Sequence, residues 1–160
     1  MEIELDELYM KIGKHIISMI PVQWSQICYL GEIEKGKMSI SSVFYFKELK
    51  NGNIVKSHNI PEVYGVSQTI YNELLSELNI LLLDLYSCFE KNSQPLWEQM
   101  SFSINADGKF NVEFYYDIMN ENDGGQVQRE VIWAYKTFGL LPKNGSCTRK
   151  TLDKYLQENK

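Results

Sequence analysis

Two groups of strands, each joined internally by tight turns, stand on either side of one long helical segment. This order constrains the fold more than any other feature of the sequence. Strands that follow one another through tight turns pair antiparallel, whereas neighbouring parallel strands need a long crossover, usually a helix. The order α-β-β-β-α-β-β-α-α therefore predicts an α+β fold, an antiparallel sheet with helices packed on it, and argues against a doubly wound nucleotide-binding fold.

The first segment, residues 4–20, has the spacing of an amphipathic helix. Its apolar side chains recur three or four residues apart, at Leu5, Leu8, Ile12, Ile16 and Met19. Acidic residues stand in or before its first turn, where the helix dipole favours anions. Pro21 disfavours the helical conformation at Ile20 and predicts the end of the helix there.

The next residues are rich in aromatic and β-branched side chains, which favour strands. Residues 24–33 and 38–47 are predicted to form a hairpin, with Lys35-Gly36 in its turn. Asn51-Gly52 is a second turn signal and leads into a short third strand near residues 53–58. The three segments together indicate a meander.

One long helix follows a connector at residues 60–66. Ser67 is a suitable N-cap, and apolar residues keep the helical period to about residue 91. Beyond it, residues 97–104 and 110–116 are two more predicted strands, and Asp107-Gly108 between them is a strong hairpin signal.

Two shorter helices are expected near the C-terminus. Val127, Val131, Tyr135 and Phe138 line one face of the first, and Gly139 suits its C-terminal cap. The last helix carries Leu152, Tyr155 and Leu156, with Ser146 or Thr148 as its N-cap. The chain shows no internal repeat and no low-complexity tract. Because 160 residues are few for two domains, we expect a single domain over residues 1–160.

The charge balance limits the partners that this chain can bind. It has 16 basic and 21 acidic residues, for a formal net charge of −5. An acidic domain is poorly suited to gripping a phosphate backbone, so no direct nucleic-acid binding is expected. It is better suited to a basic protein surface.

The cysteines, the N-terminus and the apolar runs indicate where in the cell the protein is expected. The three cysteines, Cys28, Cys88 and Cys147, are far apart and form no CxxC, which argues against a disulfide framework or a zinc site. The acidic N-terminus does not resemble a signal peptide. The apolar runs are short, such as the four residues from Ile80 to Leu83, so no membrane span is expected. We expect a cytoplasmic protein.

No pattern of residues indicates catalysis. The sequence lacks the phosphate-loop, dinucleotide, nucleophile-elbow and zinc-protease motifs. Its two histidines, His15 and His58, have no second ligand at metal-binding spacing, so packed or solvated histidines are favoured. Acids around Gly124-Gly125 disfavour a bound phosphate there. We therefore expect no catalytic residue and no cofactor, with an unrecognised enzyme site at His58 or the carboxylates as the alternative.

An acidic stretch with tyrosines is more informative. Between Glu113 and Glu130 there are five acids against one base, Arg129, and Tyr115 and Tyr116 interleave with them. Acids and rigid aromatic rings suit a basic protein partner. The alternatives are a solvated loop and a metal site made from these carboxylates, although their spacing differs from that of a calcium-binding loop.

Five segments resemble, in the same order and at nearly the same intervals, the YezG-like immunity protein family. They are Ser18-Met19-Ile20-Pro21-Val22-Gln23-Trp24, residues 59–67 around Ile60-Pro61, Pro95-Leu96-Trp97, residues 108–114 beginning Gly108-Lys109-Phe110, and Lys136-Thr137-Phe138-Gly139-Leu140-Leu141-Pro142. Each segment is weakly specific alone. Together they extend the resemblance over roughly residues 5–142.

The resemblance implies a function. Members of this family are small cytoplasmic proteins that neutralise nuclease toxin domains, carried at the C-termini of polymorphic toxins exported by the type VII secretion system. It therefore implies tight binding to a C-terminal nuclease toxin domain and no catalysis. Two alternatives stay open: a chaperone or scaffold that escorts a secreted toxin, and an orphan immunity protein against a foreign toxin.

An inhibitor of a nuclease has to cover a basic surface, and an acidic face speeds association with it. From the local charge and aromatic content we expect the partner-binding residues to be Glu32, Glu34, Glu113, Tyr115, Tyr116, Asp117, Glu121 and Asp123. Two other segments, residues 29–36 and 115–120, depart from the family pattern. If these segments contact the toxin, we expect a toxin partner that differs from the best-known nuclease of the family.

Overall fold

The structure, a computed structural model, describes residues 1–120 and 123–160. The chain divides into two compact units, Met1–Tyr116 and Asp117–Lys160. The expectation of a single domain over residues 1–160 stays a prediction. The order of the regular elements agrees with the sequence prediction, and the α+β class with an antiparallel sheet is confirmed.

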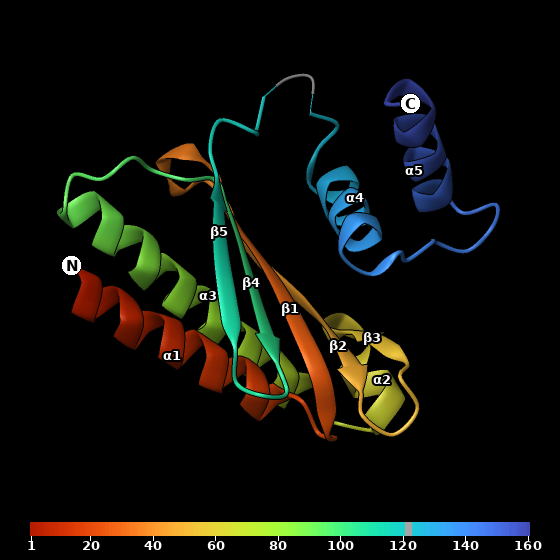
Figure 1. Cartoon of the computed structure of the whole chain (residues 1–160), viewed down its shortest axis with the longest axis horizontal. Helices are drawn as coiled ribbons and strands as arrows, with labels where there is room; N and C mark the ends of the chain where they lie inside the picture. Colours follow the sequence, from red (N-terminus) through yellow and green to blue (C-terminus); the bar gives the residue numbers. More distant parts are fainter. Residues whose placement is uncertain (121–122) are drawn as a thin grey trace. The chain divides into compact units, whose positions relative to one another are not determined.

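The first unit contains three helices and all five strands (Figure 1). In chain order they are α1 (Glu2–Met19), β1 (Trp24–Ile33), β2 (Ile40–Glu48), β3 (Ile54–Lys56), α2 (Ile60–Tyr64), α3 (Gln68–Lys91), β4 (Gln99–Asn105) and β5 (Phe110–Tyr115). Short 3₁₀ turns, η1 (Lys35–Lys37) and η2 (Ser57–Asn59), precede β2 and α2.

Local signals explain where these elements begin and end. The N–H of Ile70 donates to the Ser67 Oγ over 3.3 Å, which confirms Ser67 as the N-cap of α3. The connector expected at residues 60–66 contains the short helix α2, because Pro61 suits a first helical turn and Gly65 ends it with φ 69°. The third strand is shorter than expected because η2 begins at Ser57.

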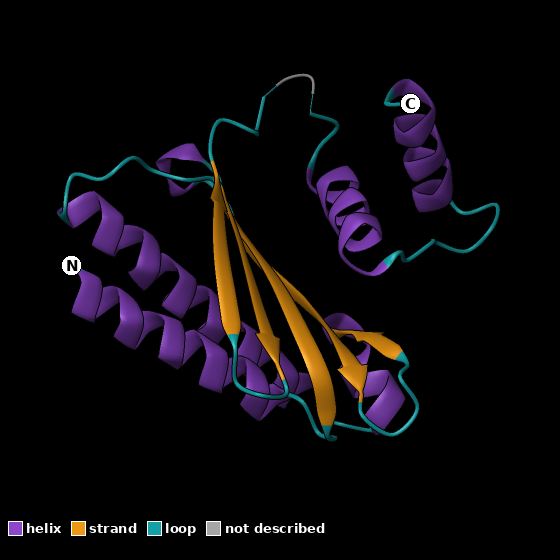
Figure 2. Ribbon diagram, viewed as in Figure 1, coloured by secondary structure: helices purple, strands orange, loops and turns teal. Residues whose placement is uncertain are grey.

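The five strands form one antiparallel sheet in the order β3-β2-β1-β4-β5 (Figure 2). β1 lies in the middle. It pairs with β2 through the first hairpin and with β4, a partner more than 60 residues away in sequence. Its pairing with β4 sets Tyr29 opposite Phe102 and Glu32 opposite Gln99. This contact joins the two predicted groups of strands.

The helices of the first unit pack on one face of the sheet, with α1 and α3 side by side (Figure 2). On that face Ile27, Tyr29 and Ile33 of β1 are fully buried. They belong to one core cluster with Ile12 of α1 and Leu82 of α3. Burial of each such side chain contributes about 1.5–3 kcal/mol.

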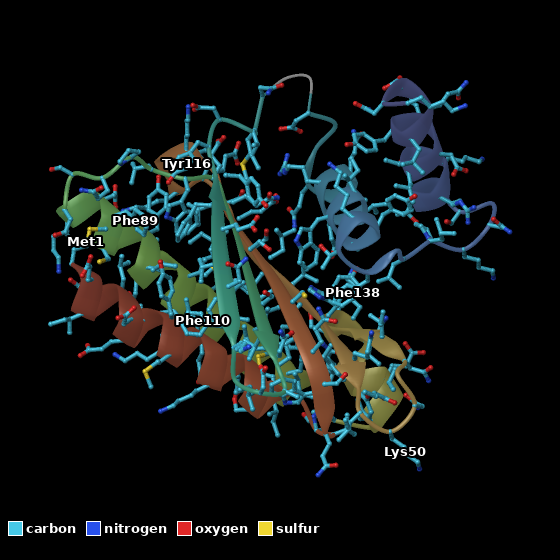
Figure 3. All side chains as sticks on the ribbon, viewed as in Figure 1. Met1, Lys50, Phe89, Phe110, Tyr116 and Phe138 are labelled. Atoms are coloured by element: carbon cyan, nitrogen blue, oxygen red, sulfur yellow. The ribbon has the colours of Figure 1, made fainter. Side chains whose placement is uncertain are left out.

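An aromatic cluster ties the start of β4 to the end of β5. Trp97 is 1% exposed, and its ring centroid lies 5.3 Å from those of both Tyr86 and Phe114. Phe89 of α3 completes the cluster, 5.0 Å from Phe114. Figure 3 shows Phe89 near Tyr116, at the end of the sheet where β5 stops. Trp97 is therefore a core residue.

The second unit contains α4 (Gln126–Phe138) and α5 (Cys147–Glu158). Gly139 ends α4 in the left-handed conformation, and Ser146 caps α5 by accepting from the N–H of Arg149, as predicted. Among the described residues of this unit, Ala134 and Leu152 are buried and apolar, and the Lys136 Nζ lies 5.4 Å from the Tyr155 ring centroid. Among the described residues, no helix is long and apolar enough to cross a membrane.

Gly31 lies at a point where the sheet and α3 approach closely. A Cβ at this position would lie 2.7 Å from the Tyr29 Oη and 2.8 Å from the nearer methyl carbon of Leu82. The Tyr29 hydroxyl leans over the glycine to reach the Ser42 Oγ, 2.7 Å away. A larger residue would displace both neighbours from the core.

We expect Gly31→Ala to lower the free energy of unfolding by about 1–3 kcal/mol, because overpacking strains the buried neighbours. Gly13 of α1 provides the matched control, since its added Cβ meets nothing closer than 3.4 Å. Gly13→Ala should raise the unfolding free energy by up to about 1 kcal/mol through helix propensity. Urea unfolding measures both, and equal effects of the two variants would contradict this account of Gly31.

Candidate partner-binding surface

The second face of the sheet, here named the outer face, consists of the strand positions that point away from α1, α2 and α3. Because side chains alternate along a strand, the neighbours of the core-facing residues belong to it. In β1 these are Cys28, Leu30 and Glu32; the paired residues of β4 are Ser103, Ser101 and Gln99. In β5 they are Asn111, Glu113 and Tyr115. Three of the predicted site residues therefore share one face.

One row of this face joins Glu32, Gln99 and Tyr115 across three strands. The Gln99 Nε2 donates to the Glu32 Oε2 over 2.8 Å. Glu32 is only 4% exposed, so its carboxylate is held within the structure and does not present a freely accessible charge. Gln99 was missed by the sequence analysis, because its role depends on the register of β1 against β4.

The next row places Glu113 opposite Ser101. The Glu113 carboxylate accepts hydrogen bonds from the Tyr115 Oη at 2.5 Å and from the Asn111 Nδ2 at 3.2 Å. The hydrogen bond to Glu113 and burial together raise the pKa of Tyr115 to about 12. Residues 111, 113 and 115 thus form an exposed, preorganised polar strip on β5.

Two further predicted residues lie at the end of the sheet where β1 stops, β4 starts and β5 stops. The backbone joins these three points: the N–H of Ile33 donates to the Glu98 carbonyl, and the N–H of Glu98 donates to the Tyr115 carbonyl, each over 2.9 Å. Glu34 follows β1 and is exposed, accepting from the Ser39 Oγ at 3.1 Å. Tyr116 follows β5 and is 45% exposed.

The remaining predicted residues belong to the second unit or lie outside the described chain. Asp117 is exposed and opens the second unit with φ 51°. Asp123 is 13% exposed at its side chain and holds the start of α4, because it accepts from the N–H groups of Asn120 and Gly125 and pairs with Arg129 at 2.9 Å. Glu121 lies outside the described residues.

The pKa of the Asp123 carboxyl reflects this local role. Burial acts to raise it, but the hydrogen bonds from Gly125 and Asn120 and the charge of Arg129 outweigh burial and lower the pKa. The carboxylate is therefore engaged within the second unit. A contribution of Asp123 to partner binding stays a prediction.

Several predicted site residues of the first unit are far apart in the sequence but lie close together in the sheet. Glu32 and Glu34 lie some 80 residues before Tyr115 and Tyr116, yet the sheet brings all four to one end. Glu113 continues the set along β5. The accessible part of this group is Glu34, Glu113, Tyr115 and Tyr116, which we name the β5-end surface.

His15 packs between two helices, whereas His58 is exposed beside a buried serine. The His15 Nε2 lies 2.7 Å from the Leu74 carbonyl oxygen and so links α1 to α3. The His58 Nδ1 lies 3.3 Å from the Oγ of Ser57, which is fully buried and accepts from the Phe44 N–H over 3.1 Å. A buried, bonded hydroxyl is a poor nucleophile. Among the described residues, no three metal-ligating side chains come together.

The Glu113→Gln variant tests the polar strip. The neutral amide no longer holds the phenol proton by charge, so we expect the pKa of Tyr115 to fall from about 12 toward the ordinary value of 10.0. NMR titration of the Tyr115 ring resolves this change. Glu34→Gln, which removes a carboxylate at the same end of the sheet, should leave the Tyr115 pKa in place; a Tyr115 pKa unaffected by Glu113→Gln would contradict the geometry.

Comparison with known proteins gives consistent matches over both units. The model of the family "Immunity protein YezG-like" matches residues 5–152. The "Immunity protein YezG" of Bacillus spizizenii is 31% identical over 156 residues, which cover 98% of this chain and 95% of the relative. The protein of the same name in Bacillus subtilis is 30% identical, covering 88% and 91%. The "Type VII secretion system protein EsaG" of Staphylococcus aureus is 27% identical, covering 98% and 96%.

Proposed function

This chain belongs to the YezG-like immunity protein family, and we propose that it binds and neutralises the nuclease domain of a toxin exported by the type VII secretion system. The observation that carries the proposal is the family match over residues 5–152, together with the likeness to EsaG, whose name includes that secretion system. In this proposal the chain acts in the cytoplasm by binding a protein, without a cofactor and without catalysis.

The charge of the chain supports a basic partner. A nuclease domain presents a positive surface to the phosphate backbone of its substrate, and a protein of net charge −5 is attracted to such a surface. Complementary potentials mainly speed association and fix orientation. The proposed inhibitor therefore reaches its target quickly and occupies the surface that nucleic acid would use.

The β5-end surface is the proposed contact. It combines the exposed carboxylates of Glu34 and Glu113 with the rings of Tyr115 and Tyr116. Tyrosines supply large, rigid contact area at protein interfaces. The hydrogen bond from the Tyr115 Oη to Glu113 holds both side chains in place before binding, which lowers the entropic cost of association. Asp117, the next residue after Tyr116 in the chain, belongs to the second unit and stays a predicted contact residue.

Growth under co-expression tests the proposal. The chain is expressed in cells together with each of a panel of nuclease toxin domains from type VII-secreted toxins. We expect rescue of growth and a one-to-one complex in a pull-down with at least one toxin. Complexes that form while the toxin still kills would support the scaffold alternative, and rescue only against toxins from other strains would support the orphan alternative. A lack of both rescue and binding across the panel would contradict the proposal.

The proposed contact makes a kinetic prediction. Glu113→Lys combined with Asp117→Lys should slow association with the bound toxin domain at least tenfold at low salt, because both changes replace attraction by repulsion. The matched control is Glu62→Lys with Glu73→Lys, the same charge change at exposed positions of α2 and α3. Stopped-flow or surface binding kinetics measure both. If both double variants slow association equally, the effect comes from the net charge of the chain, and the proposed contact site is contradicted.

A further inference from the structure

The two edges of the sheet differ in how open they are. β3 forms one edge with only three residues, ends at Lys56 and runs directly into η2. β5 forms the other edge with six residues, and its register with β4 is continuous from Phe110 to Tyr115. Within β5, all of which the structure describes, there is no proline, lysine or bulge, the features that usually block further pairing. β5 is therefore an edge able to accept another strand.

The backbone of β5 shows which groups face this edge. The carbonyl oxygens of Lys109 and Tyr115 accept from Asn105 and Glu98, on the side of β4. In an antiparallel strand the N–H and C=O of one residue point to the same side, and those of the next residue to the opposite side. The N–H and C=O groups of Phe110, Val112 and Phe114 therefore point away from β4, toward the free edge.

Apolar surface accompanies these backbone groups. Phe110 is 54% exposed, although its ring stacks on Phe102 with centroids 5.6 Å apart (Figure 3 labels Phe110). Beside it an open groove of about 190 Å³ runs between α1 and the β4–β5 hairpin, with Met10 and Ile17 of α1 in its lining. Both are exposed, at 57% and 39%. Exposed apolar side chains beside unpaired backbone groups favour the pairing of this edge with another strand, because pairing removes both from water.

We propose that β5 pairs antiparallel with β5 of a second copy of this chain, about a twofold axis that passes through Val112. The strand and the residue before it are self-complementary in this register: Lys109 lies opposite Tyr115 of the second copy, Phe110 opposite Phe114, and Asn111 opposite Glu113. The outward N–H of Val112 meets the outward C=O of its counterpart, and Phe110 and Phe114 meet in the same way. This inference does not depend on the proposed function.

The charges and rings select this register. Opposite side chains on one face of a sheet interact, and so do those two residues further along. Here Lys109 lies diagonal to Glu113 of the second copy, and the exposed Phe110 ring gains an aromatic partner. Moving the axis to Glu113 would set two carboxylates opposite each other, which is unfavourable. The charged residues thus permit a dimer at Val112 even though the whole chain is acidic.

The mass of the full chain in solution tests the dimer. In sedimentation velocity across a concentration series, we expect the species of twice the chain mass to increase with concentration. Phe110→Lys, which replaces the exposed ring by a charge near Lys109, should weaken dimerisation at least tenfold. Ile80→Lys is the matched control, because Ile80 of α3 is 58% exposed and lies away from the edge. A monomer at every concentration, or a dimer insensitive to Phe110→Lys, would overturn the proposal.

Hydrogen exchange followed by NMR locates the contact and needs no variant. The amides of Phe110, Val112 and Phe114 should exchange slowly at high concentration and quickly at low concentration. The amides of Asn111 and Glu113 face β4 and should be protected at both. A concentration-independent pattern would exclude pairing at this edge and leave it for another occupant, such as a strand of the toxin.

A charge swap tests the register. Lys109→Glu should weaken the dimer at least fivefold, since the introduced carboxylate would then repel Glu113 of the second copy. Adding Glu113→Lys restores the diagonal attraction with the signs exchanged, so the double variant should recover the dimer. Failure of the double variant to recover, with circular dichroism showing that it folds, would overturn the register at Val112.

Discussion

The pairing of β1 with β4 is the contact on which the rest of the structure depends. It joins the first meander to the second hairpin across more than 60 residues of sequence and makes β1 the central strand. Through it Tyr29 and Phe102 meet under α1 and α3, and the core becomes continuous. The same register brings the end of β1 to the end of β5. The core and the proposed binding surface therefore both depend on the pairing of β1 with β4.

The fold leaves its two faces and two edges unequal. The helices of the first unit pack on one face of the sheet, and alternate positions of the strands point to the outer face. On β5 these positions carry Asn111, Glu113 and Tyr115, a polar strip on the one edge strand that is long and unblocked. A protein that functions by binding another protein needs such a rigid, preorganised and accessible strip. The Glu32 carboxylate is buried, and the Asp123 carboxylate accepts a hydrogen bond from the backbone just before α4.

Much of this fold could be predicted from local sequence signals, because helices and tight turns depend on nearby residues. Ser67, Gly139 and Ser146 act where the sequence predicts them. The short helix α2 was not predicted in the connector after β3, because so short a helix has too few apolar residues to show helical periodicity. Strand pairing between distant segments depends on packing, so the opposition of Glu32 and Gln99 could not be predicted. Nor could the free edge of β5, which becomes apparent only once the strand order is known.

The proposed role of this immunity protein is to neutralise a nuclease by binding it. Titration of a purified nuclease toxin domain with the chain, followed by the rate of nucleic-acid cleavage, tests this most directly. We expect the nuclease activity to fall linearly and to reach background at one chain per toxin domain. Full nuclease activity in a complex saturated with the chain would contradict it, because binding would then occur without inhibition.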